Sequence, residues 1–127
     1  MREPTTPEEP TLYLAAPFTA KAEARAARHY LNSHGFLVRA RWMDSHNAEF
    51  PACGAKVAAE EAWADLCDID VCDGFVMLNL YIGVGKSIEM GFALAKGKRI
   101  WVVGEANHIF YFLPGVQVVR DVSEVRW

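Results

Sequence analysis

The chain has 127 residues, 52% of them hydrophobic, which is enough for one domain with a buried core and excludes a wholly disordered protein. Thirteen Lys and Arg residues against 16 Asp and Glu residues give a net charge of −3. This balance argues against a protein that coats a nucleic acid polymer or binds an anionic membrane through a basic face. A small charged ligand held in a local pocket is compatible with it.

No stretch of the sequence predicts a membrane anchor or a secretory signal. The longest uncharged stretches, residues 74–85 and 106–119, are shorter than the roughly 18 residues that a spanning helix needs. Residues 1–10 contain three prolines and three glutamates and have no apolar core segment, so we expect a disordered tail there. The domain is then expected to cover residues 11–127.

The cysteines and histidines do not have the spacing of a metal site. The residues concerned are Cys53, Cys67, Cys72, His29, His34, His46 and His108. Three cysteines without a CxxC pair are typical of free thiols in a reducing compartment. We therefore expect a cytoplasmic protein without a metal.

Short apolar runs alternate with helical patterns along the chain, as in α/β proteins. We expect strands at residues 12–16, 36–42, 75–79, 99–103 and near 117–119. We expect helices from Thr19, as N-cap, to about Ser33, from about 55 to 71, and from the glycine-rich turn 81–87 to Lys96. Their buried stripes would be Ala20, Ala24, Ala27 and Leu31 in the first helix and Ala58, Ala62, Leu66 and Ile69 in the second.

This order predicts an α/β fold with a doubly wound, parallel, five-stranded sheet, flavodoxin-like or Rossmann-like. In the flavodoxin-like strand order 2-1-3-4-5, the topological switch lies between the first and third strands, and ligands bind beyond the carboxyl ends of the strands at such a switch. The loops at residues 16–19 and 79–87 would line the crevice there.

Glu89 follows the glycine-rich turn, and we expect it in the first turn of the third helix. Acidic residues are common at that position because the helix dipole stabilises them, so an ordinary structural role explains it. The alternative is that Glu89 is a catalytic nucleophile. The field of the helix dipole would then keep the carboxylate ionised and nucleophilic, while Ile88 and Met90 limit its hydration.

The turn from Gly83 to Ser87 does not have the spacing of a phosphate-binding P-loop, because Asn79 stands where the first glycine would be. What is left is a helix start, whose backbone N–H groups can hold an anion or a hydroxyl. Lys86 either adds a positive charge to this cradle or is an ordinary surface lysine.

Asp65 lies eight residues before Asp73, which opens the third strand. Eight helical residues rise about 12 Å and six strand residues about 20 Å, so Asp65 reaches most of the way to the crevice rim. It could equally belong to a solvated acidic face with its neighbours Glu60, Glu61, Asp68 and Asp70. Tyr13 and Trp42 are core residues by default, but each lies close enough to a carboxyl end to face a ligand.

Three segments together resemble the nucleoside 2-deoxyribosyltransferase family, in particular its short, single-domain bacterial and phage-type members. They are Leu12-Tyr-Leu-Ala-Ala-Pro17, Asp65-Leu-Cys-Asp-Ile-Asp-Val-Cys-Asp73 and Gly83-Val-Gly-Lys-Ser-Ile-Glu-Met-Gly-Phe-Ala-Leu-Ala-Lys-Gly-Lys98. The likeness extends through Val102–Gly115, and thus over almost all of the chain from residue 11.

By this resemblance Glu89 is the carboxylate that attacks the anomeric carbon, Asp65 assists at the base or sugar, and Tyr13 orients Glu89. The implied activity is cleavage or transfer of the N-glycosidic bond of a nucleoside or nucleoside 5′-monophosphate, without a metal or other cofactor. Two alternatives stay open, namely a non-catalytic nucleotide-binding or nucleotide-sensing module and a different small α/β enzyme that acts on a nucleotide derivative.

The expected substrate contacts come from the crevice loops, the end of the second strand and the segment after the fourth strand. They are Ala16, Pro17, Phe18, Trp42, Asn79, Gly83, Gly85, Lys86, Ser87, Asn107 and His108. Residues 107–113 carry five consecutive large apolar side chains, which predicts a homodimer or larger homo-oligomer. In the resembling family this region helps to complete a neighbour's pocket, which would make Asn107 or His108 a contributor to the other subunit. The cradle at residues 83–87 favours a 5′-monophosphate over a free nucleoside.

Overall fold

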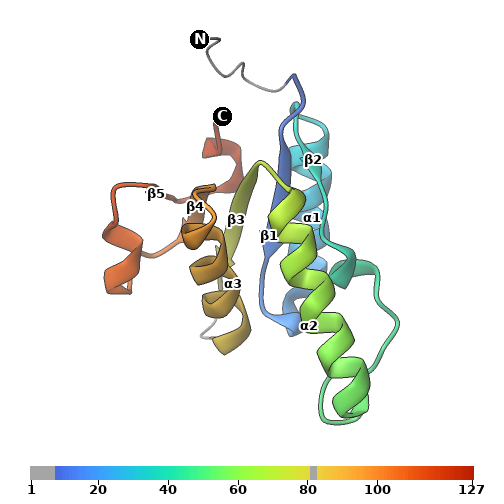
Figure 1. The fold of residues 1–127 in the computed structure, drawn as a ribbon. Helices are drawn as coiled ribbons and strands as arrows, with labels where there is room; N and C mark the ends of the chain where they lie inside the picture. The colour runs from blue at the N-terminus through green and yellow to red at the C-terminus, as the bar shows by residue number, and fades with distance from the viewer. Residues whose placement is uncertain (1–7, 81–82) are drawn as a thin grey trace, which may run out of the picture.

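The computed structural model describes residues 8–80 and 83–127, which form a five-stranded sheet with helices on both faces (Figure 1). The strands are β1 (Thr11–Ala15), β2 (Leu37–Val38), β3 (Gly74–Asn79), β4 (Arg99–Gly104) and β5 (Val116–Val119). The helices are α1 (Lys21–Asn32), α2 (Gly54–Val71) and α3 (Val84–Ala95). Short 3₁₀ turns are η1 (Phe18–Ala20), η2 (Arg41–Asp44), η3 (Ile109–Phe112) and η4 (Val122–Glu124).

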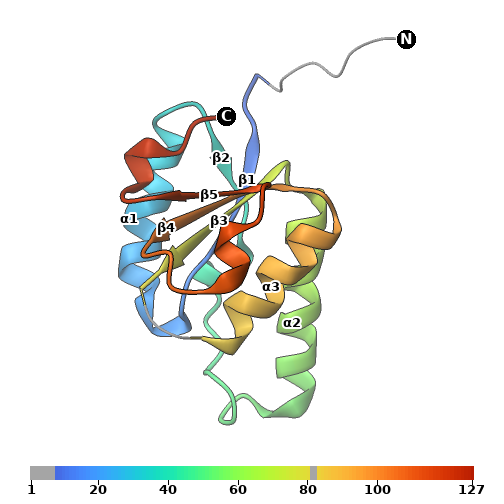
Figure 2. The same ribbon diagram turned by 90° about the vertical axis from the view of Figure 1, so that its left-hand side faces the viewer.

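The sheet has the order β2-β1-β3-β4-β5, and every neighbouring pair is parallel. Figure 2 shows α1 and η4 on one face of the sheet and α2 and α3 on the other. The doubly wound, flavodoxin-like fold predicted from the sequence is confirmed. The order reverses between β1 and β3, so a crevice at their carboxyl ends lies between loops from opposite faces.

The core lies on both faces of the central strands. All residues of β3 except Asn79 are buried, as are Leu12, Tyr13, Leu14 and Ala15 of β1. These runs are apolar on both sides because a central parallel strand is covered by helices on each face. The predicted stripe of the first helix is also confirmed, since all four of its residues are buried.

The strand predicted at residues 36–42 is present but shorter than predicted, because only Leu37 and Val38 pair with β1. An ion pair between the exposed Arg41 and the buried Asp68 explains the early end. The backbone N–H of Arg41 donates to the Asp68 carboxylate at 3.1 Å, and its guanidinium contacts the same group at 2.9 Å. This contact draws the chain toward α2 and into η2, and Asp68 is consequently buried rather than part of a solvated face.

Two predicted helix starts are also wrong. Thr19 is not an N-cap, because the N–H of Ala20 donates to the Pro17 carbonyl at 2.8 Å and closes η1 before α1 begins at Lys21. The third helix begins earlier than expected, at Val84 with Gly83 as N-cap. Glu89 therefore lies in the second turn of α3 and not in the first.

The buried stripe predicted for the second helix is only partly correct. Ile69 is buried, Ala58 and Leu66 are half-buried, and Ala62 is exposed. The reason is geometric, since the N-terminal half of α2 extends past the carboxyl ends of the strands (Figure 1). This half of the helix borders the site end of the molecule instead of covering the sheet.

The predicted tail falls mostly on residues 1–7, which lie outside the described residues. Pro10, also assigned to the tail, is buried, and its carbonyl accepts a hydrogen bond from the N–H of Leu37 at 3.0 Å. The packed part of the chain thus includes Pro10. Among the helices of residues 8–80 and 83–127, none is both long enough and apolar enough to cross a membrane.

Gly74 and Gly91 offer a matched test of this packing. A Cβ at Gly74 would lie 2.9 Å from a Leu12 methyl and 3.0 Å from the Trp101 ring, whereas a Cβ at Gly91 in α3 meets nothing within 4 Å. Gly74→Ala should lower the free energy of unfolding by about 1–3 kcal/mol through overpacking. Gly91→Ala should raise it by about 0.5–1 kcal/mol. Urea titration checks both, and equal effects would contradict the packing at the start of β3.

Candidate functional site

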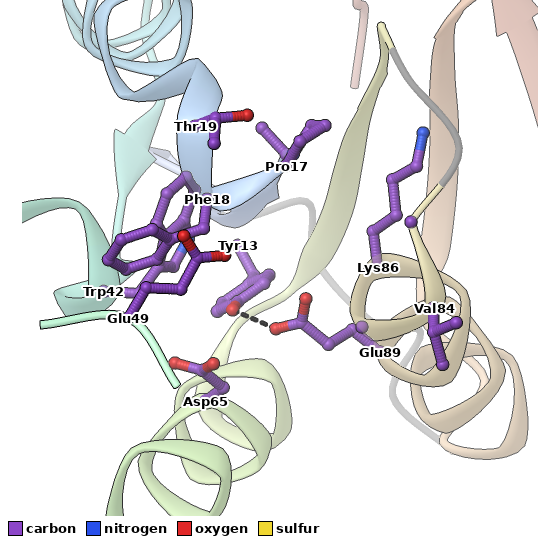
Figure 3. A pocket seen from close by; sticks show the side chains of 13 residues that line it. Tyr13, Pro17, Phe18, Thr19, Trp42, Glu49, Asp65, Val84, Lys86 and Glu89 are labelled. Carbon is purple, nitrogen blue, oxygen red and sulfur yellow. Dashed lines mark hydrogen bonds between the residues drawn. The ribbon is translucent and has the colours of Figure 1, made fainter. Parts of the chain in front are cut away.

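A pocket of about 490 Å³ opens at the carboxyl end of β1, at the topological switch. It is built by β1 and the loop that follows it, by η2 and the loop after it, by α2 and by the start of α3 (Figure 3). The lining residues are Tyr13, Ala16, Pro17, Phe18, Thr19, Trp42, Glu49, Asp65, Gly83, Val84, Gly85, Lys86 and Glu89. The three residues expected to be catalytic thus meet in one pocket, although they lie on β1, α2 and α3.

Tyr13 and Glu89 form the central contact of this pocket. The phenol hydroxyl of Tyr13 donates a hydrogen bond to a Glu89 carboxylate oxygen. Tyr13 is fully buried and its ring stacks on Phe75 at a centroid distance of 5.8 Å. Burial, together with the negative charge of Glu89, raises the pKa of Tyr13 well above 10. The phenol therefore keeps its proton and acts as a fixed donor to Glu89.

Burial raises the pKa of Glu89 to about 7, against the lowering influence of the Tyr13 hydrogen bond. The negative charge of Asp65 raises it further. The expectation that the helix dipole keeps Glu89 ionised is wrong, because the dipole acts mainly within the first turn and Glu89 lies in the second. Desolvation controls this carboxyl instead.

Asp65 also has a raised pKa, at about 7. Burial is the main cause, and the nearby carboxylates of Glu61 and Asp68 add to it, while Arg41 partly offsets them. In Figure 3 the Glu89 carboxyl points to the Tyr13 hydroxyl, and Asp65 on α2 lies below them in the same pocket. Both carboxyls are therefore partly protonated near neutral pH, so that one can act as an acid and the other as a nucleophile.

The start of α3 forms a third side of the pocket. Gly83 is the N-cap, and no side chain caps the helix. The first backbone N–H groups of a helix have no intrahelical partner, and the dipole adds positive potential there. A Cβ at Gly85 would meet nothing within 4 Å, so a ligand can approach this turn closely. The arrangement suits a phosphate or a hydroxyl group.

Lys86 is not a surface lysine, since it is only 4% exposed. Its ammonium donates to the Asn79 side-chain carbonyl at 2.9 Å, and burial lowers its pKa. The Asn79 amide in turn donates to the Glu105 carbonyl at 2.8 Å and to Asn107 at 2.9 Å. Lys86 thus ties the first turn of α3 to the ends of β3 and β4, and its stem lines the pocket.

Four residues expected to bind substrate do not line the pocket. The side chains of Asn79 and Asn107 are hydrogen-bonded to each other, and Asn79 also accepts from the Lys86 ammonium. The Ser87 hydroxyl turns back to the Gly83 carbonyl at 3.2 Å, because the helix already includes this residue. The His108 ring accepts from the N–H of Phe110 at 3.3 Å and caps η3.

The rings of Phe18 and Trp42 form an aromatic wall, which lies on the Asp65 side of the pocket and opposite α3 (Figure 3). The indole N–H of Trp42 donates to the Leu14 carbonyl at 2.8 Å, and the ammonium of Lys21 lies 4.2 Å from the centre of the Phe18 ring. Both rings are therefore held in place by polar contacts. Aromatic faces of this kind suit the flat ring of a nucleobase.

Thr19 and Val84 line the pocket as part of the two loops expected there, although neither is among the expected substrate contacts. Sequence reasoning missed Glu49 as a pocket residue. Glu49 lies on the loop between η2 and α2, where neither hydrophobic periodicity nor a motif indicates which side chains turn inward. Among residues 8–80 and 83–127, no group of three or more His, Cys, Asp or Glu residues could hold a metal ion.

The buried carboxyl of Glu89 should make stability depend on pH. A pKa raised from 4.5 to about 7 means that the folded state binds more protons than the unfolded state between these values. The stability that the protonated Glu89 contributes to the folded state is fully present below about pH 4.5. It is lost as the pH rises through the folded-state pKa of about 7. Glu89→Gln should therefore be increasingly more stable than wild type from pH 4.5 to pH 7, by on the order of 1–3 kcal/mol at the top. Chemical denaturation across this range measures the difference.

Glu60→Gln is the matched control, since Glu60 is exposed on α2. Its difference from wild type should not grow in this way. A Glu89→Gln difference that is constant with pH would contradict a desolvated carboxyl.

Comparison with known proteins supplies a fold relationship. No protein-family model matches the sequence, and neither does any curated protein. A 2-deoxyribosyltransferase from the psychrotolerant bacterium Bacillus psychrosaccharolyticus superimposes with a TM-score of 0.68 at 19% identity, covering 89% of this chain and 88% of the other. The CMP N-glycosidase of Clostridium botulinum superimposes with a TM-score of 0.54 at 21% identity, covering 90% and 92%. The chain therefore has the fold of these two enzymes over nearly its whole length.

Proposed function

We propose that this protein cleaves or transfers the N-glycosidic bond of a deoxynucleoside or nucleoside 5′-monophosphate, through a covalent intermediate on Glu89. The observation that carries the proposal is the buried Tyr13–Glu89 hydrogen bond, which faces Asp65 in the pocket at the switch between β1 and β3. The fold shared with a 2-deoxyribosyltransferase and a CMP N-glycosidase supports it.

In the first step, a Glu89 carboxylate oxygen attacks the anomeric carbon of the sugar. The bond from this carbon to the base nitrogen breaks, and its electron pair leaves with the base. Asp65, kept protonated near neutral pH by burial, donates its proton to the departing base. Tyr13 fixes the orientation of Glu89 by its hydrogen bond. The positive charge that develops on the sugar is stabilised by the adjacent carboxylate.

In the second step, the ester between Glu89 and the sugar is broken by an incoming nucleophile. Water gives hydrolysis, and the nitrogen of a second base gives transfer. The ionised Asp65 left by the first step takes the proton from this nucleophile, so the site returns to its starting state. One acid–base residue and one nucleophile suffice for both outcomes.

The pocket gives the substrate a direction. In this proposal the sugar lies over Glu89, and the base lies toward Asp65 and against the rings of Phe18 and Trp42, which line the same pocket. The 5′ end then points to the start of α3, where the free N–H groups suit a phosphate. The buried ammonium of Lys86 adds positive charge at this end, which supports a 5′-monophosphate as the substrate.

We further propose that the chain forms a homodimer or a larger homo-oligomer. On η3, Ile109 is 77% exposed and Phe112 is 72% exposed, whereas Tyr111 between them is buried. Such adjacent apolar side chains are typical of a surface covered by another chain. Asn107 and His108 lie beside this surface and not in the pocket of their own chain, so their contribution would be to the partner.

Removing the nucleophile tests the reaction. Glu89→Ala should lower base release by roughly a thousandfold or more, because the covalent step is lost. The fold should persist, since Glu89 accepts only the Tyr13 hydrogen bond among the described residues. Chromatography of a panel of deoxynucleosides and their 5′-monophosphates measures free base, and circular dichroism checks folding.

Glu60→Ala, on the exposed face of α2, is the control and should keep full activity. Base release by Glu89→Ala at the wild-type rate would overturn the mechanism. Saturable binding of the panel by the wild-type chain without any base release would indicate a binding module instead.

A further inference from the structure

A second groove, which the proposed reaction does not use, adjoins the site pocket on the side of the aromatic wall. It has a volume of about 250 Å³. The groove and the site pocket share Phe18, Trp42, Glu49 and Asp65. We call it the base-side groove, because the shared residues are those against which the proposed function places the base. The two spaces therefore adjoin at these four side chains, on the side of the pocket where the proposed function places the base.

The outer wall of the base-side groove is the loop between η2 and α2, and polar contacts fasten this loop. The Glu61 carboxylate on α2 accepts from the Ser45 hydroxyl at 2.8 Å and from the Asn47 amide at 2.5 Å. The Lys21 ammonium on α1 donates to the Ser45 carbonyl at 3.2 Å. These hydrogen bonds fasten Ser45 and Asn47 of the loop to α2 and α1. The outer wall of the groove is therefore fixed in place by the fold.

The floor and sides of the base-side groove are mainly apolar. Beyond the shared rings they comprise Phe50, Cys53, Ala58 and Ala62. Phe50 is 64% exposed, although nothing in the proposed reaction needs an aromatic side chain there. The small side chains of Ala58 and Ala62 on α2 leave the space that a larger residue would fill.

We propose that the base-side groove holds an apolar substituent carried by the base of the substrate, on the edge opposite the sugar. This inference rests on the proposed function, which sets the direction of the base. The observations that carry it are the four shared residues, the apolar lining and the fastened loop. A cavity of about 150 Å³ already accommodates a benzene ring, so a ring-sized substituent fits. The substrate class is then a base-modified nucleoside or nucleotide.

Glu49 and Asp65 at the junction refine this class. Carboxyl groups there accept hydrogen bonds from N–H groups on the base, whereas an apolar group directly against them would leave them without a partner. The substituent should therefore enter between these side chains and the rings of Phe18 and Trp42, and contact Phe50 beyond them. Its burial also removes the exposed Phe50 ring from water.

The test compares two matched ligand pairs, as nucleosides and as 5′-monophosphates. They are deoxyuridine with and without a benzyl group on carbon 5 of the base, and deoxyadenosine with and without a benzyl group on its exocyclic amine. Calorimetry measures binding to Glu89→Gln, which does not turn the ligands over, and chromatography measures base release by the wild type. In at least one pair the benzyl ligand should bind about tenfold more tightly than its parent. No preference in either pair would overturn the proposal.

A variant that fills the groove distinguishes binding of the benzyl group in the groove from non-specific hydrophobic binding elsewhere on the protein. Ala62→Phe places a ring in the groove, and it should abolish the benzyl preference while leaving binding of the unsubstituted parent within about twofold of its original value. Ala59→Phe adds the same ring on an exposed residue of α2 that does not line the groove, and it should keep the preference. A preference that survives Ala62→Phe would overturn the groove assignment.

The outcomes also separate this inference from the proposed reaction. Base release from the parent nucleosides without a benzyl preference supports the reaction and overturns the groove assignment. A benzyl preference that Ala62→Phe abolishes, with no base release from any ligand, supports the groove and overturns the reaction.

Discussion

The hydrogen bond from Tyr13 to Glu89 is the contact on which the site depends. A buried phenol needs an acceptor, and a desolvated carboxyl needs a donor. Tyr13 on β1 and Glu89 on α3 satisfy each other at the switch between β1 and β3. The parallel sheet brings these two elements together although they are distant in sequence. Because the Glu89 carboxyl is held by a buried donor, its orientation is fixed before a ligand arrives, which lowers the cost of reaching the reacting geometry.

The same burial sets the electrostatics. Glu89 and Asp65 both have pKa values of about 7, and their surroundings differ in one respect. Glu89 has the Tyr13 donor, which favours its ionised form, whereas Asp65 has the neighbouring charges of Glu61 and Asp68, which favour its protonated form. This difference supports the proposed roles of Glu89 as the nucleophile and Asp65 as the acid. In the same proposal, the positive end of α3 receives the 5′ end of the substrate.

The strand order and the place of the crevice could be predicted, because apolar runs and crossover rules determine where the carboxyl ends of parallel strands lie. The grouping of Tyr13, Asp65 and Glu89 is implied by the family resemblance, since the residue pattern alone leaves ordinary structural roles open for them. The residue at which the second strand ends could not be predicted, since it depends on the ion pair between Arg41 and Asp68, which are distant in sequence. The burial of Lys86 and its bond to Asn79 likewise depend on where α3 begins. Glu49 lies on a loop without periodicity, so its inward position follows from the tertiary contacts of that loop alone.

The central claim is that Glu89 forms a covalent bond to the sugar, and trapping that bond tests it most directly. A fluorine on carbon 2 of the sugar destabilises the positively charged transition state and slows breakdown of the ester. After incubation with a 2-fluoro nucleoside, intact-mass spectrometry should show the 14.2 kDa chain increased by the mass of one fluorosugar. Peptide mapping should place this mass on Glu89. An adduct on Asp65 or on another side chain, or release of base from this compound without any adduct, would contradict the account.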